Sequence, residues 1–138
     1  MAVDFSGSWK LDSTEDNFDA FLKVCGVSWA WRKAACSVKP TVSISQPQGD
    51  SFVIITKTTY RTQEMRFVVG EEFLSTIPWE AGEHPMLAEW DSSKLVIRVL
   101  GKDISFTREV VDGLLVLTQT KGDVSSRRYF RKSPSDSQ

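Results

Sequence analysis

Residues 104–131, ISFTREVVDGLLVLTQTKGDVSSRRYFR, decide the fold of this chain. The stretch holds three strand-like runs separated by two short turns, and the runs span about 103–110, 114–120 and 124–131. The turns are Asp112-Gly113 and Gly122-Asp123. Turns this short join neighbouring antiparallel strands, because a parallel crossover needs a dozen or more residues. The stretch therefore predicts an antiparallel meander.

The same pattern of short strands and turns extends toward the N-terminus. Further strand-like runs span about 5–11, 41–46, 52–59, 61–69, 86–90 and 94–100. No second long helix interrupts them to make parallel crossovers. So many consecutive antiparallel strands in a small chain avoid open edges best by closing into a barrel. We therefore predict a mainly β fold: a closed up-and-down antiparallel barrel of about ten strands.

Two short helices are predicted directly after the first strand. Apolar residues recur at helical spacing over 17–25, Gly26 ends this helix, and a second helix runs over about 27–37. Pro40 ends the helical region. A barrel of about ten strands is wide enough to enclose a ligand cavity, so a helix pair in this position forms a helix-turn-helix lid over its mouth.

Arg108 is a charged residue in a strand-like run whose alternate positions are otherwise apolar. Ile104, Phe106, Arg108 and Val110 occupy alternate positions of one run, so in a half-buried strand all four point inward. A buried guanidinium needs an anion, an acidic partner or a wet cavity. The alternative is a strand end at which Arg108 reaches solvent.

Composition limits the location and the partners of the chain. Its 17 basic and 18 acidic residues show no excess of positive charge that would suggest nucleic acid. No apolar run reaches membrane-spanning length and no secretory signal is present, so we expect a cytoplasmic protein, with the nucleus as a second location. Cys25 and Cys36 are then expected to be free thiols. We expect one domain over 1–132 and a disordered polar tail over 133–138.

Catalytic and metal chemistry have little support in the sequence. The single histidine, His84, falls in a predicted loop, and no metal-ligand spacing is present. Neither cysteine has a candidate base close in sequence. We therefore expect no enzyme, no metal and no cofactor. A pure interaction module is also disfavoured, because it would not need an inward Arg108.

The order of strand, helix pair and meander resembles that of the intracellular lipid-binding proteins, the fatty-acid-binding and cellular retinoic-acid-binding group. The resemblance covers about residues 4–132. Its most specific segments are Gly7-Ser8-Trp9-Lys10-Leu11, Asn17-Phe18-Asp19, Val69-Gly70-Glu71-Glu72-Phe73, Thr107-Arg108-Glu109 and Arg127-Arg128-Tyr129. Segments 23–27 and 58–64 are most similar to the retinoic-acid-binding branch, whereas the hairpin at Gly101-Lys102 is closer to the fatty-acid-binding branch.

Two departures from the family pattern lie near the expected barrel mouth. The spacing from Leu11 to Asn17 is one residue longer than usual, and the segment 77–85 replaces a tighter turn. These changes bear on the identity of the ligand. Gly7-Ser8-Trp9 also resembles the opening motif of secreted lipocalins, but the chain shows neither a signal peptide nor a disulfide framework.

The resemblance implies a carboxylate-binding site on the last strands, made of two arginines and a tyrosine. These correspond to Arg108, Arg127 and Tyr129. Arg127 and Tyr129 share a strand face, and a carboxylate can accept hydrogen bonds from guanidinium groups and a phenol together. Alternation alone does not decide which face is inside, and the other face carries Arg128 and Phe130.

The resemblance also implies which residues line the cavity and its portal. They are Phe18, Leu22, Trp31, Pro40, Thr56, Thr58, Arg61, Phe106, Leu117 and Gln119. Ordinary core packing is the alternative explanation for these positions. Lys23, Arg32 and Lys33 form a basic lid patch, for which the alternatives are solvated surface charge, nuclear import and docking on an anionic membrane.

Together these features predict a monomeric carrier that binds a long-chain hydrophobic carboxylate inside the barrel, with no nucleic-acid partner. We expect a fatty acid first. Burial of the hydrocarbon contributes about 0.8 kcal/mol per CH₂, so the chain supplies most of the affinity and the polar groups set its orientation. The alternative is a retinoic-acid carrier that delivers its ligand to the nucleus, and a secreted lipocalin-like carrier is a more distant alternative.

Overall fold

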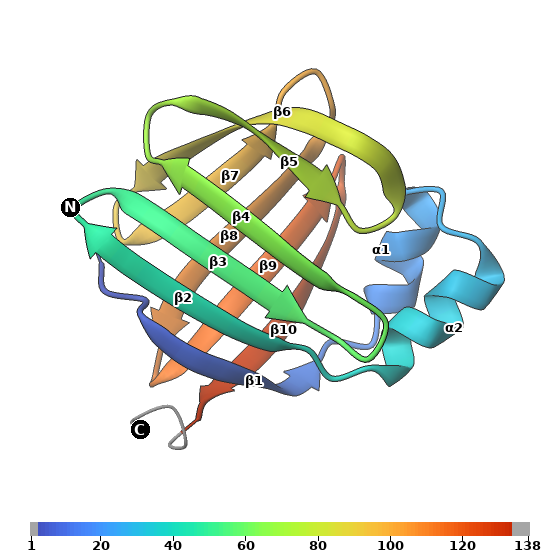
Figure 1. Ribbon diagram of the computed structural model, residues 1–138. Coiled ribbons are helices and arrows are strands. Elements are labelled where there is room, and N and C mark those ends of the chain that lie inside the picture. The colour runs from blue at the N-terminus through green and yellow to red at the C-terminus, as the bar shows by residue number, and fades with distance from the viewer. Residues whose placement is uncertain (1–2, 134–138) are drawn as a thin grey trace.

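The chain forms a ten-stranded barrel with two helices at one end (Figure 1). The structure is a computed structural model that describes residues 3–133. The helices are α1 (Phe18–Val24) and α2 (Trp29–Ser37). The strands are β1 (Gly7–Thr14), β2 (Thr41–Gln48), β3 (Ser51–Lys57), β4 (Thr62–Val68), β5 (Glu72–Ile77), β6 (Glu80–Asp91), β7 (Lys94–Val99), β8 (Ile104–Val111), β9 (Leu114–Lys121) and β10 (Val124–Lys132).

The predicted mainly β barrel with a helical lid is confirmed. The strand order is β4-β3-β2-β1-β10-β9-β8-β7-β6-β5, so neighbours in the sheet are neighbours in the chain except where β1 pairs with β10. The lid helices connect β1 to β2 and cover the right-hand end of the barrel in Figure 1. Of the predicted tail, Ser133 donates its backbone N–H to the carbonyl of Ser8 at 2.8 Å, and residues 134–138 lie outside the described residues.

The hairpin between β8 and β9 has the geometry that its two turn residues predict. Asp112 and Gly113 both have positive φ, at 52° and 81°. Two consecutive positive values are those of a type I′ turn, which twists in the same sense as the strands it joins. The turn sets the register of this hairpin, in which Val111 lies opposite Leu114 and Arg108 opposite Leu117.

Strand β5 and the first half of β6 did not appear among the predicted strands. Pro78, Gly82 and Pro85 interrupt this part of the sequence and favour a loop. In the structure Pro85 lies within β6 opposite Leu74 of β5, and its carbonyl accepts a hydrogen bond from the backbone N–H of Leu100 at 2.9 Å. The strand therefore continues through a residue that can accept but cannot donate a ladder hydrogen bond.

The barrel is open at one seam, because no ladder joins β4 to β5. Side chains close this seam instead. The rings of Phe67 and Phe73 stack with centroids 4.9 Å apart. Gln63 donates its side-chain N–H to the carbonyl of Thr76 at 2.7 Å and lies 3.0 Å from the Thr76 hydroxyl.

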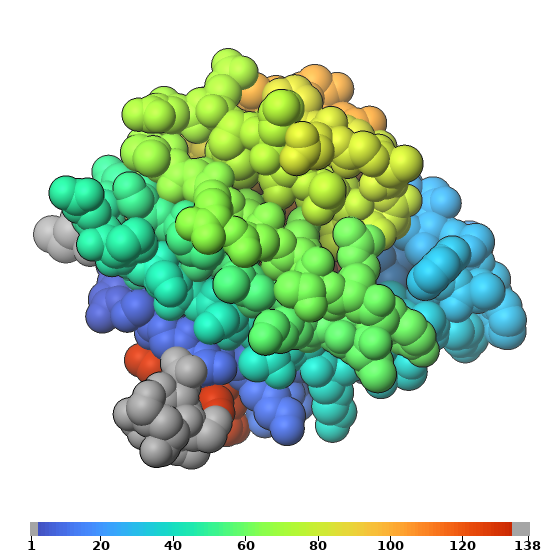
Figure 2. Space-filling model, in the orientation of Figure 1, coloured from blue at the N-terminus to red at the C-terminus, as the bar shows by residue number. Residues whose placement is uncertain are grey.

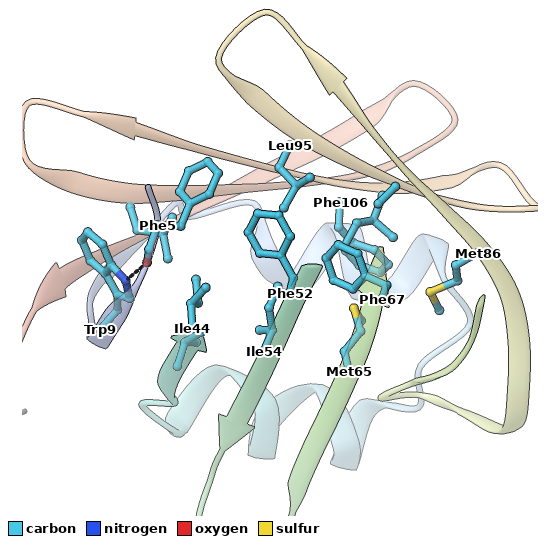
Figure 3. Close-up of a cluster of buried hydrophobic side chains, with 14 of the residues drawn as sticks. Phe5, Trp9, Ile44, Phe52, Ile54, Met65, Phe67, Met86, Leu95 and Phe106 are labelled. Atoms are coloured by element: carbon cyan, nitrogen blue, oxygen red, sulfur yellow. Dashed lines mark hydrogen bonds between the residues drawn. The ribbon is translucent and has the colours of Figure 1, made fainter. Parts of the chain in front are cut away.

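Aromatic side chains fill the end of the barrel away from the helices. Phe5, Phe52 and Phe67 are almost completely buried, and the Phe52 ring stacks on Phe67 at 5.2 Å and is tilted against Trp90 at 6.0 Å. Figure 3 shows the Phe5, Phe52 and Phe67 rings pointing toward one another from the segment before β1 and from β3 and β4. The Trp9 indole N–H is bonded to the carbonyl of Phe5 at 2.9 Å. The core is thus concentrated at this end, which leaves the lid end available for a cavity.

Strand β1 contains a β-bulge between Leu11 and Ser13. Leu11 lies opposite Phe130 of β10 and Ser13 lies opposite Tyr129, so Asp12 has no partner of its own. Asp12 and Ser13 are both exposed, whereas Leu11 and Thr14 are half-buried. The bulge absorbs one residue and returns Thr14 to the inner face of the barrel.

We predict that Gln63 stabilises the open seam. Replacing Gln63→Met keeps the length of the side chain but removes its hydrogen bonds to Thr76. Because a typical hydrogen bond contributes about 1 kcal/mol, the free energy of unfolding should fall by about that amount. Amide hydrogen exchange should also accelerate in β4 and β5, as followed by mass spectrometry.

The control is Gln48→Met, which changes an exposed glutamine of β2. Equal effects of the two substitutions on exchange in β4 and β5 would rule out a specific role of Gln63 at the seam.

Candidate functional site

A cavity of about 750 Å³ lies between the helical lid and the inner wall of the barrel. Its wall is mostly apolar and comes from the lid helices, from the β2–β6 side and from β8–β10. Figure 2 shows the outer surface on the β2–β6 side, where the blue helices project beyond the green turn between β3 and β4. The cavity is large enough for a long-chain ligand.

All ten residues expected to line the cavity and portal lie in its wall. Phe18, Leu22 and Trp31 belong to the lid, Pro40 precedes β2, and the others are Thr56, Thr58, Arg61, Phe106, Leu117 and Gln119. The wall also contains residues that the sequence did not indicate, among them Gln63, Thr76, Trp79 and Glu80. Gln63 lies on β4, whereas Thr76, Trp79 and Glu80 lie on β5, in the turn after it and at the start of β6, the part of the sheet that the sequence did not predict.

Two arginines lie in one row across the last three strands. Arg108 of β8 is opposite Leu117 of β9, and Leu117 is opposite Arg128 of β10. Residues that are directly opposite in neighbouring strands share a face, and all three line the cavity. Strands lie about 4.8 Å apart, so the two arginine backbones are about 10 Å apart and their long side chains can reach a common anion.

The inward placement of Arg127 and Tyr129 is wrong. The Arg127 side chain is 53% exposed and lies 3.9 Å from the Glu15 carboxylate, outside the barrel. Arg128 and Phe130 occupy the inner face instead, and both line the cavity. The site therefore has a phenylalanine, and no phenol, two residues beyond its second arginine.

Turn lengths alone could have corrected this assignment. Two-residue turns join β8 to β9 and β9 to β10, and each such turn determines which residues face each other. Counting outward from the first turn places Leu117 opposite Arg108. Counting from the second turn places Arg128, not Arg127, opposite Leu117. Two adjacent arginines made the family motif ambiguous by one residue, and one residue exchanges the faces of a strand.

Arg108 is a buried cation with no acidic partner in the part of the chain that the structure describes. Its residue exposure is 8%, its Nη1 is buried, and no hydrogen-bond partner of that atom exists among the described residues. Burial lowers the pKa of Arg108 to about 10. At neutral pH the group is therefore still charged, and an anion entering the cavity would neutralise it.

Arg128 is held by two neighbours. Its Nε donates a hydrogen bond to the Thr14 hydroxyl at 3.2 Å, and its Cζ lies 4.3 Å from the centre of the Phe18 ring. Burial lowers the pKa of Arg128 to about 10 as well, so this side chain is also a cation at neutral pH. Thr14 belongs to β1 and Phe18 to α1, so the barrel wall and the lid both contact this guanidinium.

Polar groups without protein partners lie beside the two arginines. Gln119 and Ser126 form the next row with Phe106, and the Gln119 Oε1 and Ser126 Oγ atoms are buried without a hydrogen-bond partner among the described residues. Within residues 3–133, no Asp or Glu is buried. The inner wall therefore offers positive charge and polar groups but no compensating carboxylate.

The basic lid patch does not form as three free charges. Arg32 bonds to the Asp19 carboxylate at 3.0 Å and donates to the carbonyl of Val27 at 2.7 Å, and its side chain is only 13% exposed. It therefore ties α2 to α1. Lys23 and Lys33 remain exposed, with the Lys33 Nζ 5.7 Å from the centre of the Trp29 ring.

Cys25 and Cys36 are free thiols, and burial raises the pKa of Cys25 to about 11. No group of three or more His, Cys, Asp or Glu residues within 3–133 could hold a metal ion. In the same part of the chain, no helix has the length and apolar character needed to cross a membrane.

Comparison with known proteins identifies the family. Residues 6–132 match the lipocalin / cytosolic fatty-acid binding protein family. Human cellular retinoic acid-binding protein 2 is 41% identical over 139 residues, which cover 91% of this chain and 96% of that protein.

Solved structures agree with this match. The REP1-NXSQ fatty acid transporter has a TM-score of 0.87 and 32% identity, covering 94% of this chain and 96% of that one. A Schistosoma mansoni fatty acid binding protein in complex with arachidonic acid has a TM-score of 0.83 and 32% identity, with the same coverage of 94% and 96%. The chain therefore belongs to the lipocalin / cytosolic fatty-acid binding protein family.

Proposed function

We propose that this protein is a non-catalytic carrier that binds a long-chain fatty acid in the barrel cavity, with its carboxylate held by Arg108 and Arg128. One observation carries the proposal: two buried arginines face the same cavity, and no buried carboxylate among residues 3–133 neutralises them. A cavity that is apolar over most of its wall and cationic at one row of residues is complementary to an amphiphilic acid. The family match supports the same class of ligand.

The two parts of the ligand contribute differently. Each buried CH₂ of the chain contributes about 0.8 kcal/mol, so a long chain supplies most of the binding free energy. Hydrogen bonds between the carboxylate and a guanidinium contribute about 1.5–3 kcal/mol. The arginines therefore determine which end of the ligand lies deep in the barrel and which lipids are preferred.

Retinoic acid is the second candidate ligand. It is supported by the 41% identity to human cellular retinoic acid-binding protein 2. Its carboxylate would use the same two arginines, so the two candidates differ only in how the hydrocarbon fills the cavity. Competition between an oleate-like and a retinoate-like ligand would rank them.

The chemistry of the thiols supports a carrier without covalent catalysis. Burial raises the pKa values of both Cys25 and Cys36, so both are protonated and poorly nucleophilic at neutral pH. The two arginines hold their protons far above neutral pH and cannot act as general bases there. Binding and release are what this site can perform.

Exposed aromatic side chains on the lid support transient contact with a membrane. Trp29 and Trp31 of α2 are each 66% exposed, and Tyr60 in the turn between β3 and β4 is 64% exposed. Trp and Tyr are the residues that favour the membrane–water interface, and Lys33 adds positive charge beside Trp29. The proposed place of action is the cytosol. Nuclear import through the lid patch loses support, because Arg32 is engaged with Asp19.

We predict that both inward arginines recognise the acid group. Arg108→Gln and Arg128→Gln should each weaken binding of oleate by about 10- to 100-fold and leave binding of methyl oleate within about threefold, because only the acid uses the positive charge. Titration with a displaced fluorescent lipid would measure both affinities.

Arg127→Gln is the matched control, since Arg127 is the adjacent arginine on the outer face. Removing a buried unpaired charge should also leave the thermal stability of ligand-free Arg108→Gln unchanged or raised, which excludes misfolding as the cause of weaker binding. Loss of the same size for acid and ester would refute the site.

A second prediction concerns the missing phenol. Phe130 lies two residues beyond Arg128 on the inner face, so Phe130→Tyr would place a hydroxyl donor beside that guanidinium. The affinity for oleate should rise severalfold while the affinity for methyl oleate stays the same. Tyr129→Phe, which removes the outward phenol, should change neither value. A gain shared by acid and ester would mean that the new hydroxyl does not meet the carboxylate.

A third prediction concerns lid docking. Trp29→Ala should slow transfer of a fluorescent fatty acid to phosphatidylcholine vesicles that contain phosphatidylserine, without changing the equilibrium affinity, because Trp29 does not line the cavity. The exposed Leu74 of β5 provides a control of similar exposure outside the lid, as Leu74→Ala. Unchanged transfer rates in Trp29→Ala would exclude docking through this residue.

A further inference from the structure

Arg128 is the point at which the barrel wall, the lid and the cavity meet. Its Nε is bonded to Thr14 of β1 at 3.2 Å, and its planar group lies against the Phe18 ring of α1 at 4.3 Å. Its residue exposure is 8%. Arg108, by contrast, has no hydrogen bond to any described residue at its buried Nη1. The two arginines of the row are therefore in different situations: the buried Nη1 of Arg108 has no hydrogen-bond partner among the described residues, whereas Arg128 is held by Thr14 and Phe18.

The bond to Thr14 determines which edge of the guanidinium can meet a ligand. A guanidinium offers a carboxylate two bidentate edges, one that includes Nε and one made by the two Nη groups. Thr14 occupies Nε. Only the Nη edge is left, so a carboxylate can pair with Arg128 end-on, from the cavity side.

Phe18 connects the same guanidinium to the lid. The Phe18 ring is 5% exposed and belongs to the apolar cluster of the lid with Phe21, Leu22 and Val27. A cation over an aromatic face is attracted to it, and this attraction is stronger in a desolvated site. Lid closure and the orientation of Arg128 therefore depend on the same contact.

The bulge in β1 makes the Thr14 contact available. Because Asp12 and Ser13 both point outward, Thr14 comes to lie opposite Arg128 on the inner face. The bulge thereby brings the Thr14 hydroxyl to the Nε of Arg128.

We propose that Thr14 and Phe18 are positioning residues that present the Nη edge of Arg128 to the ligand carboxylate, and that Phe18 thereby links recognition of the acid group to closure of the lid. The inference rests on the proposed function, because it assigns roles around the same anion site. Neither residue contacts the carboxylate in this arrangement; both act through Arg128.

The test compares the acid-over-ester preference, which is the affinity for oleate divided by that for methyl oleate, in a set of variants. Thr14→Val keeps the shape of the side chain but removes the hydroxyl, and should lower this preference about fivefold. Thr14→Ser keeps the hydroxyl and should restore the wild-type preference. A purely structural role of Thr14 would change acid and ester equally.

Phe18→Leu and Phe21→Leu form a matched pair for the lid. Both shorten an aromatic residue of the same cluster, but only Phe18 contacts Arg128. Phe18→Leu should lower the acid-over-ester preference about fivefold, and Phe21→Leu should leave it at the wild-type value. In the wild type, oleate should protect the α1 amides from hydrogen exchange more than methyl oleate does, and Phe18→Leu should abolish this difference.

Arg128→Gln distinguishes a failure of the positioning role from a failure of the proposed function. If Arg128→Gln abolishes the preference but Thr14→Val and Phe18→Leu retain it, the positioning role is overturned while the proposed function stands. A failure of Thr14→Ser to restore the preference would overturn the role of the hydroxyl. If Arg128→Gln itself keeps the preference, the proposed function fails first.

Discussion

An unpaired guanidinium inside a protein is the constraint on which this barrel depends. Transfer of a charge out of water without a partner is too costly for a dry core, so the interior around Arg108 has to stay wet or be filled by an anion. The rest of the chain is consistent with that requirement. Aromatic packing is concentrated at the end away from the helices, and the lid covers the other end without filling it. Stability and an open cavity are thus assigned to opposite ends of one sheet.

The same constraint links binding of an anionic ligand to the stability of the folded barrel. An anion that binds only the folded barrel stabilises it by mass action, and the stabilisation grows with the ligand concentration relative to its dissociation constant. In the ligand-free protein, two desolvated cations lie on one wall of the cavity. They repel each other, and no described carboxylate neutralises them. The charges that recognise the ligand therefore lower the stability of the ligand-free protein, as is common for preformed binding sites.

The sequence predicted the barrel, the lid and the wall of the cavity because these depend on local patterns. Alternation, short turns and helical spacing are all visible without knowledge of tertiary contacts. The inner face of β10 was missed because Arg127 and Arg128 are adjacent, and only the register across both hairpins separates them. Strand β5 and the first half of β6 were missed because Pro78, Gly82 and Pro85, which follow β5 in the sequence, favour a loop. The role of Arg32 depends on Asp19 and on the carbonyl of Val27, which belong to other turns of the lid and which no spacing rule brings together.

Because no backbone ladder joins β4 to β5, the ring of strands is interrupted at one place. A ring of ten continuous ladders could widen only by breaking backbone hydrogen bonds along a whole strand. Here the circumference is interrupted, and side chains span the break. Gln63 and Arg61 donate hydrogen bonds to the carbonyls of Thr76 and Pro78 across it, and the Phe67 and Phe73 rings stack. Widening the barrel therefore costs a few side-chain contacts and leaves every ladder intact. The cross-section of the cavity can adapt to thin, flexible chains and to broader, rigid ones, while the two arginines on the opposite wall keep their spacing.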